Sequence, residues 1–281
     1  MSQQTSAPVL YTFGGSVWAA VPELALRELG YSSETISKQT VNLVLGENFK
    51  PDFVKINPNA TLPTLEADGK AYTSTTEVTA YLVQNAPKKV KAGNADFIKE
   101  IHEDSIDPNF ALLLARNQEE LAAKAAGLPG VFLSNRQDTL AKVAASTEGK
   151  EFEEFYADKI AGNGGLLDIY RGNALEATKD GFFQQSQNHF ANVGAYILQS
   201  LPKRLPEDTA FLGGNIPGED DFHLGAWLAR IAATVGATKS EEGLAALKDA
   251  FGAEVPDPVA AYWKAWSSRD SWKDVYGEGL H

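Results

Sequence analysis

Residues 57–82, NPNATLPTLEADGKAYTSTTEVTAYL, constrain the fold more than any other stretch of the chain. Leu62-Pro63 stands directly before a short apolar strand at residues 64–66. Proline cannot donate to a strand ladder, and it restricts the residue before it. The pattern therefore predicts a preset turn, with a cis peptide bond at Pro63. Such a turn leaves the backbone N–H and C=O of Leu62 free to pair with an extended ligand.

The second half of this stretch predicts a hairpin and then a helix. Asp68-Gly69 is a hairpin signal. Ser74 followed three residues later by Glu77 is a capping box, which opens a helix. The helix start offers unpaired N–H groups, the hydroxyls of Ser74 and Thr75 and a positive dipole end, so it can hold a carboxylate. The structural alternative is that Pro63 marks only a turn and Ser74 only a helix start.

Residues 9–56 predict the rest of a small α/β domain. Residues 9–13 indicate a first strand, residues 17–29 a helix with Pro22 inside it, and residues 35–44 a second strand. The segment 46–53 is typical of a loop that leads into a short helix. Together with the hairpin, this order predicts a βαβ-like unit followed by two strands and a helix.

Ser16 is the residue that we expect to carry chemistry. It lies between the first strand and the first helix, at or near the N-cap. A hydroxyl there can donate to a ligand thiolate, and the helix dipole lowers the pKa of the thiol in the same direction. Two alternatives stay open: Ser16 only caps the helix, or Tyr11 at the end of the first strand acts instead.

The remainder of the chain is expected to be helical. Residues 86–95 are polar, basic and carry Pro and Gly, as in a linker. Long helical stretches are predicted at 95–126, 139–160 and 173–201, separated by breaks at 127–130 and 162–165. The pattern indicates a helical bundle with short connections. Asp221 opens a further helix with Gly218 as its N-cap, which predicts a structural role for Asp221, and three tryptophans near the end predict packing or lining positions: Trp263, Trp266 and Trp272.

Composition excludes several classes of function. The formal charge of −12 is unsuited to nucleic acid or an anionic membrane. The chain has no cysteine, which excludes disulfides, thiolate metal sites and a cysteine nucleophile. No apolar run approaches 18 residues, and MSQQTSAPVL lacks the features of a secretory signal. The four histidines are far apart in the sequence, so no metal site is predicted.

The order of motifs in residues 9–83 and 211–231 resembles the glutathione transferase superfamily. Leu62-Pro63 match the hydrophobic residue and cis-proline of that family, and Ser74-Thr75 fall at its acidic-Ser pair. Asp221 matches the acidic residue of its buried helix. The loop YTFGGSVWAAVPELALRELGY and the variant STTEV look most like the fungal-specific A class of wood-decaying basidiomycetes, which is related to bacterial lignin β-etherases.

This resemblance implies a thioredoxin-like α/β domain at residues 1–86, a linker at 87–95 and an all-helical domain at 96–281. It implies that Ser16, or alternatively Tyr11, activates the glutathione thiol. The implied glutathione-binding residues are Ser16, Lys50, Thr61, Leu62, Pro63, Ser74 and Thr75, with Trp18 and Asn48 as further candidates. Lys50 as a solvated surface charge and Trp18 as a core residue are the structural alternatives.

The expected function is that of a cytoplasmic, homodimeric, serine-type glutathione transferase. By resemblance it conjugates glutathione, its co-substrate, to small aromatic electrophiles or reduces peroxides, with β-etherase as a side activity and detoxification of xenobiotics as its role. Two other classes stay open. One is a ligandin that binds phenolic or wood-derived compounds with weak catalysis, and the other is a non-enzymatic interaction module.

Overall fold

The computed structural model describes residues 7–281. Residues 1–6, which open the segment expected to lack a secretory signal, lie outside the described residues. The chain divides into two compact units. The first unit contains Met1–Gln39, Leu62–Phe110 and His189–His281, and the second contains Thr40–Thr61 and Ala111–Asn188.

A four-stranded sheet is the base of the first unit. Its order is β2 (Ser37–Thr40), β1 (Val9–Thr12), β3 (Thr64–Ala67) and β4 (Lys70–Tyr72). β3 runs antiparallel to both β1 and β4. The predicted hairpin is confirmed: Asp68 and Gly69 join β3 to β4 with φ of 53° and 73°, as a two-residue type I′ turn requires.

The second strand is shorter than the predicted range 35–44. β2 ends at Thr40, and all its residues are exposed. Beyond it, the Asn42 side chain accepts the backbone N–H groups of Val44 and Leu45 at 2.9 and 3.1 Å. This local turn gives the backbone partners that a strand ladder would otherwise supply, so the strand stops before it.

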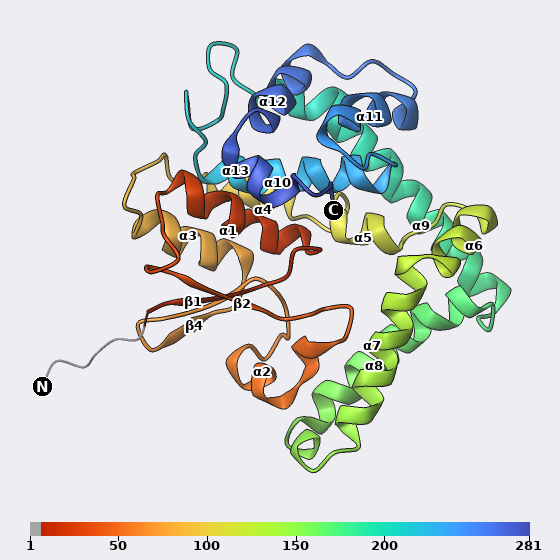
Figure 1. Cartoon of the computed structure of the whole chain (residues 1–281). Coiled ribbons are helices and arrows are strands. Elements are labelled where there is room, and N and C mark those ends of the chain that lie inside the picture. The colour runs from red at the N-terminus through yellow and green to blue at the C-terminus, as the bar shows by residue number, and fades with distance from the viewer. Residues whose placement is uncertain (1–6) are drawn as a thin grey trace, which may run out of the picture. The chain divides into compact units, whose positions relative to one another are not determined.

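Helices cover the sheet within the first unit (Figure 1). α1 (Val17–Glu28) and α3 (Thr75–Gln84) pack side by side, and α10 (Glu219–Thr234) and α13 (Asp270–Tyr276) pack against α1. α1 continues through Pro22, as predicted. The remaining helices of this unit are α4 (Ala95–Ile101), η3 (Tyr196–Ser200), η4 (Leu201–Lys203), η5 (Ser240–Glu242), α11 (Gly243–Phe251) and α12 (Asp257–Ser267).

Asp221 is structural, as the sequence predicts. Its carboxylate accepts the N–H groups of Gly218, Leu212 and Gly213 at 2.7–2.8 Å and the hydroxyl of Tyr262 at 3.0 Å. Burial raises the pKa of Asp221 to about 6. These bonds stabilise the N-terminus of α10, a helix that is buried along almost its whole length. The three C-terminal tryptophans are also buried, and the Trp272 ring contacts both Trp263 and Trp266.

The second unit is built on a pair of long neighbouring helices. α7 (Leu128–Ala144) and α8 (Glu153–Arg171) lie side by side (Figure 1), joined through η2 (Glu148–Phe152). The other elements are η1 (Glu47–Phe49), α2 (Pro51–Ile56) and α6 (Gln118–Ala126). The boundary between the units falls inside α5 (Pro108–Leu113) and α9 (Glu176–Ala195).

The helix predictions for 95–126 and 139–160 and the predicted break at 162–165 are wrong. Residues 95–126 form three short helices rather than one or two long ones, because Pro108 begins α5 and the Asn117 side chain caps α6 at Glu120 N. Residues 162–165 do not break a helix, since α8 runs through them, and α7 ends at Ala144. Asn163 supplies the reason: its side chain bonds across to α7.

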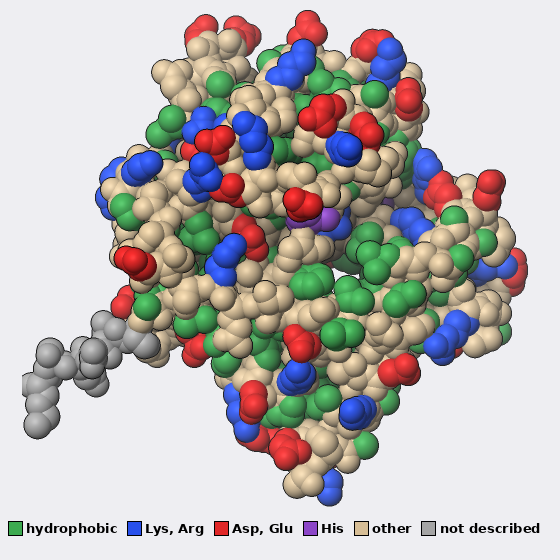
Figure 2. All heavy atoms as spheres, in the orientation of Figure 1, with side chains coloured by type: hydrophobic (Ala, Val, Ile, Leu, Met, Phe, Trp, Pro, Cys, Tyr) green, Lys and Arg blue, Asp and Glu red, His purple; other side chains and the backbone are tan. Residues whose placement is uncertain are grey.

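The surface does not gather charge of one sign on the face shown in Figure 2, where acidic and basic side chains are interspersed. Within residues 7–281, no helix is long and apolar enough to cross a membrane.

Candidate functional site

Ser16 caps the N-terminus of α1. Its backbone is extended, with φ of −103° and ψ of 118°, and its Oγ accepts the N–H of Ala19 at 3.4 Å. Its own N–H donates to the Phe13 carbonyl at 2.9 Å. In the described part of the chain, the Ser16 hydroxyl donates to no acceptor. The half-buried hydroxyl can therefore donate a hydrogen bond to a bound ligand at the positive end of α1.

A buried arginine lies next to Ser16. Arg230 of α10 is 5% exposed, and its Nη2 donates to the Gly15 carbonyl at 2.6 Å. Burial lowers the pKa of Arg230, and its Nε has no partner among the described residues. The contact fixes the peptide before Ser16 and places a positive charge beside it. Sequence reasoning missed Arg230, although a lone charge in the apolar run FHLGAWLARI is an unusual feature.

The cis peptide bond at Leu62-Pro63 is confirmed. Leu62 and Pro63 are buried, and Thr64 opens β3 opposite Tyr11 of β1. Within residues 7–281, the backbone N–H and C=O of Leu62 have no hydrogen-bond partner. This leaves a short backbone edge that can pair with an extended chain.

The helix start at Ser74 is also as predicted. Ser74 Oγ accepts the N–H of Glu77 at 3.2 Å, and Glu77 Oε2 accepts the N–H of Thr73 at 3.1 Å and the hydroxyl of Ser74 at 3.2 Å. The Thr73 N–H, more than the other contacts, holds the pKa of Glu77 below its usual value. Thr75 is buried in the first turn. The Ser74 hydroxyl is therefore shared with Glu77.

Tyr11, the alternative to Ser16, has its hydroxyl committed elsewhere. The Tyr11 O–H donates to Glu66 Oε2 at 2.5 Å, and the ring is 7% exposed. Burial, helped by Glu66, raises the pKa of Tyr11 to about 12. This pairing makes Tyr11 a poor donor to a ligand thiolate.

Trp18 is a core residue that joins a cluster of rings. It stacks on His102 with centroids 3.7 Å apart. His102 Nε2 lies 2.9 Å from Nδ1 of the fully buried His223. Burial lowers the pKa of His102 to about 4 and raises the pKa of Asp107 to about 6. Sequence spacing gave no signal for this histidine pair.

Three predicted ligand contacts belong to the second unit. Asn48 is buried and donates to the Ala60 carbonyl at 2.8 Å, and Lys50 Nζ bonds Glu47 at 2.9 Å. Thr61 is exposed, and its carbonyl accepts from Asn57 at 3.0 Å. The other candidates belong to the first unit: Tyr11, Ser16, Trp18, Leu62, Pro63, Ser74 and Thr75. The described residues hold no group of three metal-ligating side chains.

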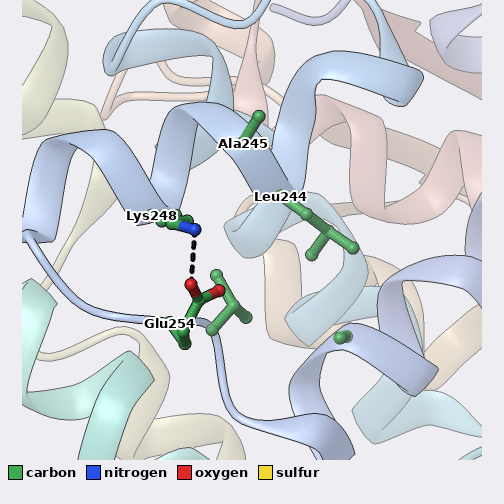
Figure 3. A pocket seen from close by; sticks show the side chains of 6 residues that line it. Leu244, Ala245, Lys248 and Glu254 are labelled. Carbon is green, nitrogen blue, oxygen red and sulfur yellow. Dashed lines mark ion pairs between the residues drawn. The ribbon is translucent and has the colours of Figure 1, made fainter.

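A separate hollow of about 200 Å³ lies beside α11 (Figure 3). Its two charged side chains, Lys248 and Glu254, form an ion pair. Apolar side chains make up the rest of its lining: Leu244, Ala245, Val255 and Ala260. Because its charges already neutralise each other, this hollow is a weaker candidate than the region around Ser16.

Comparisons with known proteins bear on the fold and on the N-terminal domain. Residues 10–90 match the family model of the glutathione S-transferase N-terminal domain. A glutathione transferase family member from Pseudomonas fluorescens, solved with two glutathione bound, is similar to the chain at a TM-score of 0.57 and 13% identity. That match covers 99% of this chain and 95% of the other. A glutathione transferase from Populus trichocarpa is similar at a TM-score of 0.54 and 16% identity, over 98% of this chain and 100% of the other.

At these identities the solved structures establish the fold, and the family model identifies the domain. The chain therefore has the glutathione transferase fold, with a glutathione S-transferase N-terminal domain at residues 10–90 and a large helical region after it.

Proposed function

We propose that this chain is a serine-type glutathione transferase in which Ser16 stabilises the glutathione thiolate. The observation that carries the proposal is the free Ser16 hydroxyl at the positive end of α1, in the same unit as the unpaired backbone of Leu62. A hydroxyl donor and a helix dipole both favour the thiolate over the thiol. The glutathione found in the Pseudomonas relative supports the choice of tripeptide.

In this proposal the cysteine backbone of glutathione pairs with Leu62 beside Pro63. The γ-glutamyl carboxylate sits on Ser74, Thr75 and the unpaired N–H groups at the start of α3. Lys50, Thr61 and, to a lesser extent, Asn48 serve the glycine end, and Trp18 lies behind the thiol position. The functional boundaries are 1–86 for the glutathione-binding domain, 87–95 for the linker and 96–281 for the helical domain.

The thiolate itself is the nucleophile, so the protein needs none of its own. In conjugation, sulfur forms a bond to an aromatic electrophile, and the leaving group departs with its electron pair. Ser16 keeps its proton and donates a hydrogen bond throughout. Peroxide reduction begins with the same thiolate. Because the chain has no cysteine, it forms no mixed disulfide with glutathione.

The finer parts of the proposal follow the resemblance to the fungal A class. Small aromatic or phenolic molecules are the second ligand, the protein is a cytoplasmic homodimer, and ether cleavage is a side activity. Sedimentation tests the dimer directly, because a monomer has a mass of 30.3 kDa. A single species at that mass would contradict the dimer and leave the glutathione site intact.

A calorimetric titration with glutathione tests the function first, followed by a second titration with a phenolic ligand present. Simultaneous binding, together with turnover of an aromatic electrophile, is the expected result. Binding of the phenol without turnover would favour the ligandin alternative. If glutathione does not bind at millimolar concentration, the transferase proposal fails and an interaction module remains.

A further inference from the structure

The two long helices of the second unit carry two cations on neighbouring aromatic rings. The Arg136 guanidinium carbon of α7 lies 4.7 Å from the Phe49 ring centroid, and Lys159 Nζ of α8 lies 5.4 Å from the Phe155 centroid. The Phe49 and Phe155 centroids are 6.5 Å apart with planes inclined at 44°. Two positive groups therefore flank a pair of contacting rings.

Hydrogen bonds from buried side chains hold the two helices and the Phe49 segment in place. The buried Tyr156 hydroxyl donates to the Phe49 carbonyl at 2.7 Å. Between α7 and α8, the Asn163 side chain donates to the Leu133 carbonyl at 3.0 Å and to Gln137 Oε1 at 2.8 Å. These bonds fix the register of the helices that present the two cations.

Neither cation has an acidic partner. Within residues 7–281, neither Arg136 nor Lys159 takes part in an ion pair, and Arg136 Nε is buried without a hydrogen-bond partner. Burial and the neighbouring Arg136 lower the pKa of Lys159, while Asp158 opposes this shift. The chain has 37 acidic against 25 basic residues, yet neither of these two cations forms an ion pair with a carboxylate of the described residues. Two like charges in a partly buried, partly desolvated environment repel each other, and a bound anion would relieve this repulsion.

We propose that Arg136 and Lys159 form a binding site for a carboxylate, with the half-buried Phe155 ring receiving an aromatic or other planar group attached to it. A guanidinium takes a carboxylate in bidentate geometry, and an ammonium adds a second charge-assisted bond. Arg136, Phe155 and Lys159 are half-buried, so a ligand can reach them, whereas Phe49 is 1% exposed and serves as the support beneath Arg136. The carboxylate belongs either to a free aromatic acid or to glutathione, and the test below separates these sources.

Calorimetric titration with benzoate, with the neutral isostere benzamide alongside it, tests the site. The proteins compared are the wild type, Arg136→Gln, Lys159→Gln and the control Lys142→Gln. Lys142 is an exposed cation on the same helix, so the control removes the same charge away from the rings. We expect benzoate to bind the wild type and the control alike, and each test variant about tenfold more weakly, the loss of one charge-assisted bond.

Equal binding of benzoate and benzamide to the wild-type protein would overturn the proposal without relying on any variant. Equal losses in all three variants would overturn it too, since they would reflect general charge rather than a site. Competition between benzoate and glutathione assigns the carboxylate to glutathione, and simultaneous binding assigns it to a separate acid. The site rests on its own geometry: if benzoate binds as expected and glutathione does not bind at all, only the proposed transferase function fails.

Discussion

Ser16 and Tyr11 differ in what their hydroxyls are free to do. The Ser16 hydroxyl donates no hydrogen bond within the described residues, whereas the Tyr11 hydroxyl donates one to Glu66. We therefore expect Ser16→Ala to lower kcat/KM roughly 100-fold, by analogy with the loss of one oxyanion donor. The dissociation constant of glutathione should change little, since its backbone contacts remain. Tyr11→Phe is the matched control and should retain turnover within a few-fold. Steady-state kinetics with an aromatic electrophile, alongside calorimetry, measures both quantities.

The opposite pattern, with Tyr11→Phe inactive and Ser16→Ala active, would assign the thiolate to the tyrosine. Activity unchanged in both variants would leave only backbone N–H donors at the start of α1 as stabilisers of the thiolate.

The buried histidine pair predicts a loss of stability in acid. The pKa of His102 is about 4 in the folded chain, against about 6.5 unfolded, so the unfolded state takes up the proton first. Stability from this group is present above pH 6.5 and is lost as pH falls toward 4. At pH 5 the loss is about 2 kcal/mol, from about 1.4 kcal/mol per pH unit.

Urea unfolding at pH 7.5 and 5 measures this effect, with His102→Gln as the comparison. The wild type should lose about 2 kcal/mol more than the variant between the two pH values. Asp107 titrates in the same range with the opposite sign, because burial raises its pKa to about 6, but it is present in both proteins. Identical pH dependence of the two proteins would contradict the assignment.

Local patterns predicted the residues whose roles are local. The Ser74 cap, the cis bond before Pro63 and the contact of Asp221 with the Gly218 N-cap all depend on neighbours within a few positions. The contacts of Arg230 with Gly15 and of His102 with His223 span 215 and 121 positions. No periodicity or spacing rule connects such pairs, because only the tertiary fold brings them together.

Among the elements, α8 shows why a glycine-rich segment was misread as a break. Glycine costs helix stability, and residues 162–165 hold three of them. The compensation comes from α7, which receives the buried Asn163 side chain through two hydrogen bonds. Packing against a neighbouring helix therefore overrides a weak local propensity, and that neighbour is invisible to a local reading of the sequence.

This explanation separates neighbouring positions of α8. A Cβ at Gly162 or Gly165 meets no atom within 4 Å, so Gly165→Ala should stabilise the protein by about 0.5–1 kcal/mol. Asn163→Ala should destabilise it by about 2 kcal/mol, because a buried carbonyl and amide lose their partner. Chemical denaturation of the two variants gives both values. A stabilising Asn163→Ala would show that the helix pairing does not depend on this residue.

In the first unit, ion pairs join α1, near the start of the described chain, to residues 269–274, near its end. One of these pairs is largely buried and the others are exposed. Glu28 of α1 accepts two N–H groups of Arg269 at 2.6 Å and the Ser271 hydroxyl at 2.5 Å. On the same α1–α13 contact, Arg27 bonds Asp270 and Asp274. The side chains of Glu28 and Arg269 are 10% and 28% exposed, whereas that of Arg27 is 52% exposed.

Replacing Arg269 should therefore lower the free energy of unfolding of the first unit more than replacing Arg27 does. Arg269→Met leaves the nearly buried Glu28 carboxylate with an unpaired charge, so we expect a loss of about 2 kcal/mol, somewhat below the range for a fully buried pair. Arg27→Met removes a solvent-screened pair and should cost less than about 1 kcal/mol. Urea unfolding followed by tryptophan fluorescence reports on both, because Trp263, Trp266 and Trp272 are buried in this unit. Equal losses would mean that burial does not decide the strength of this closure, and a negligible loss for Arg269→Met would mean that packing of α13 alone holds it against α1.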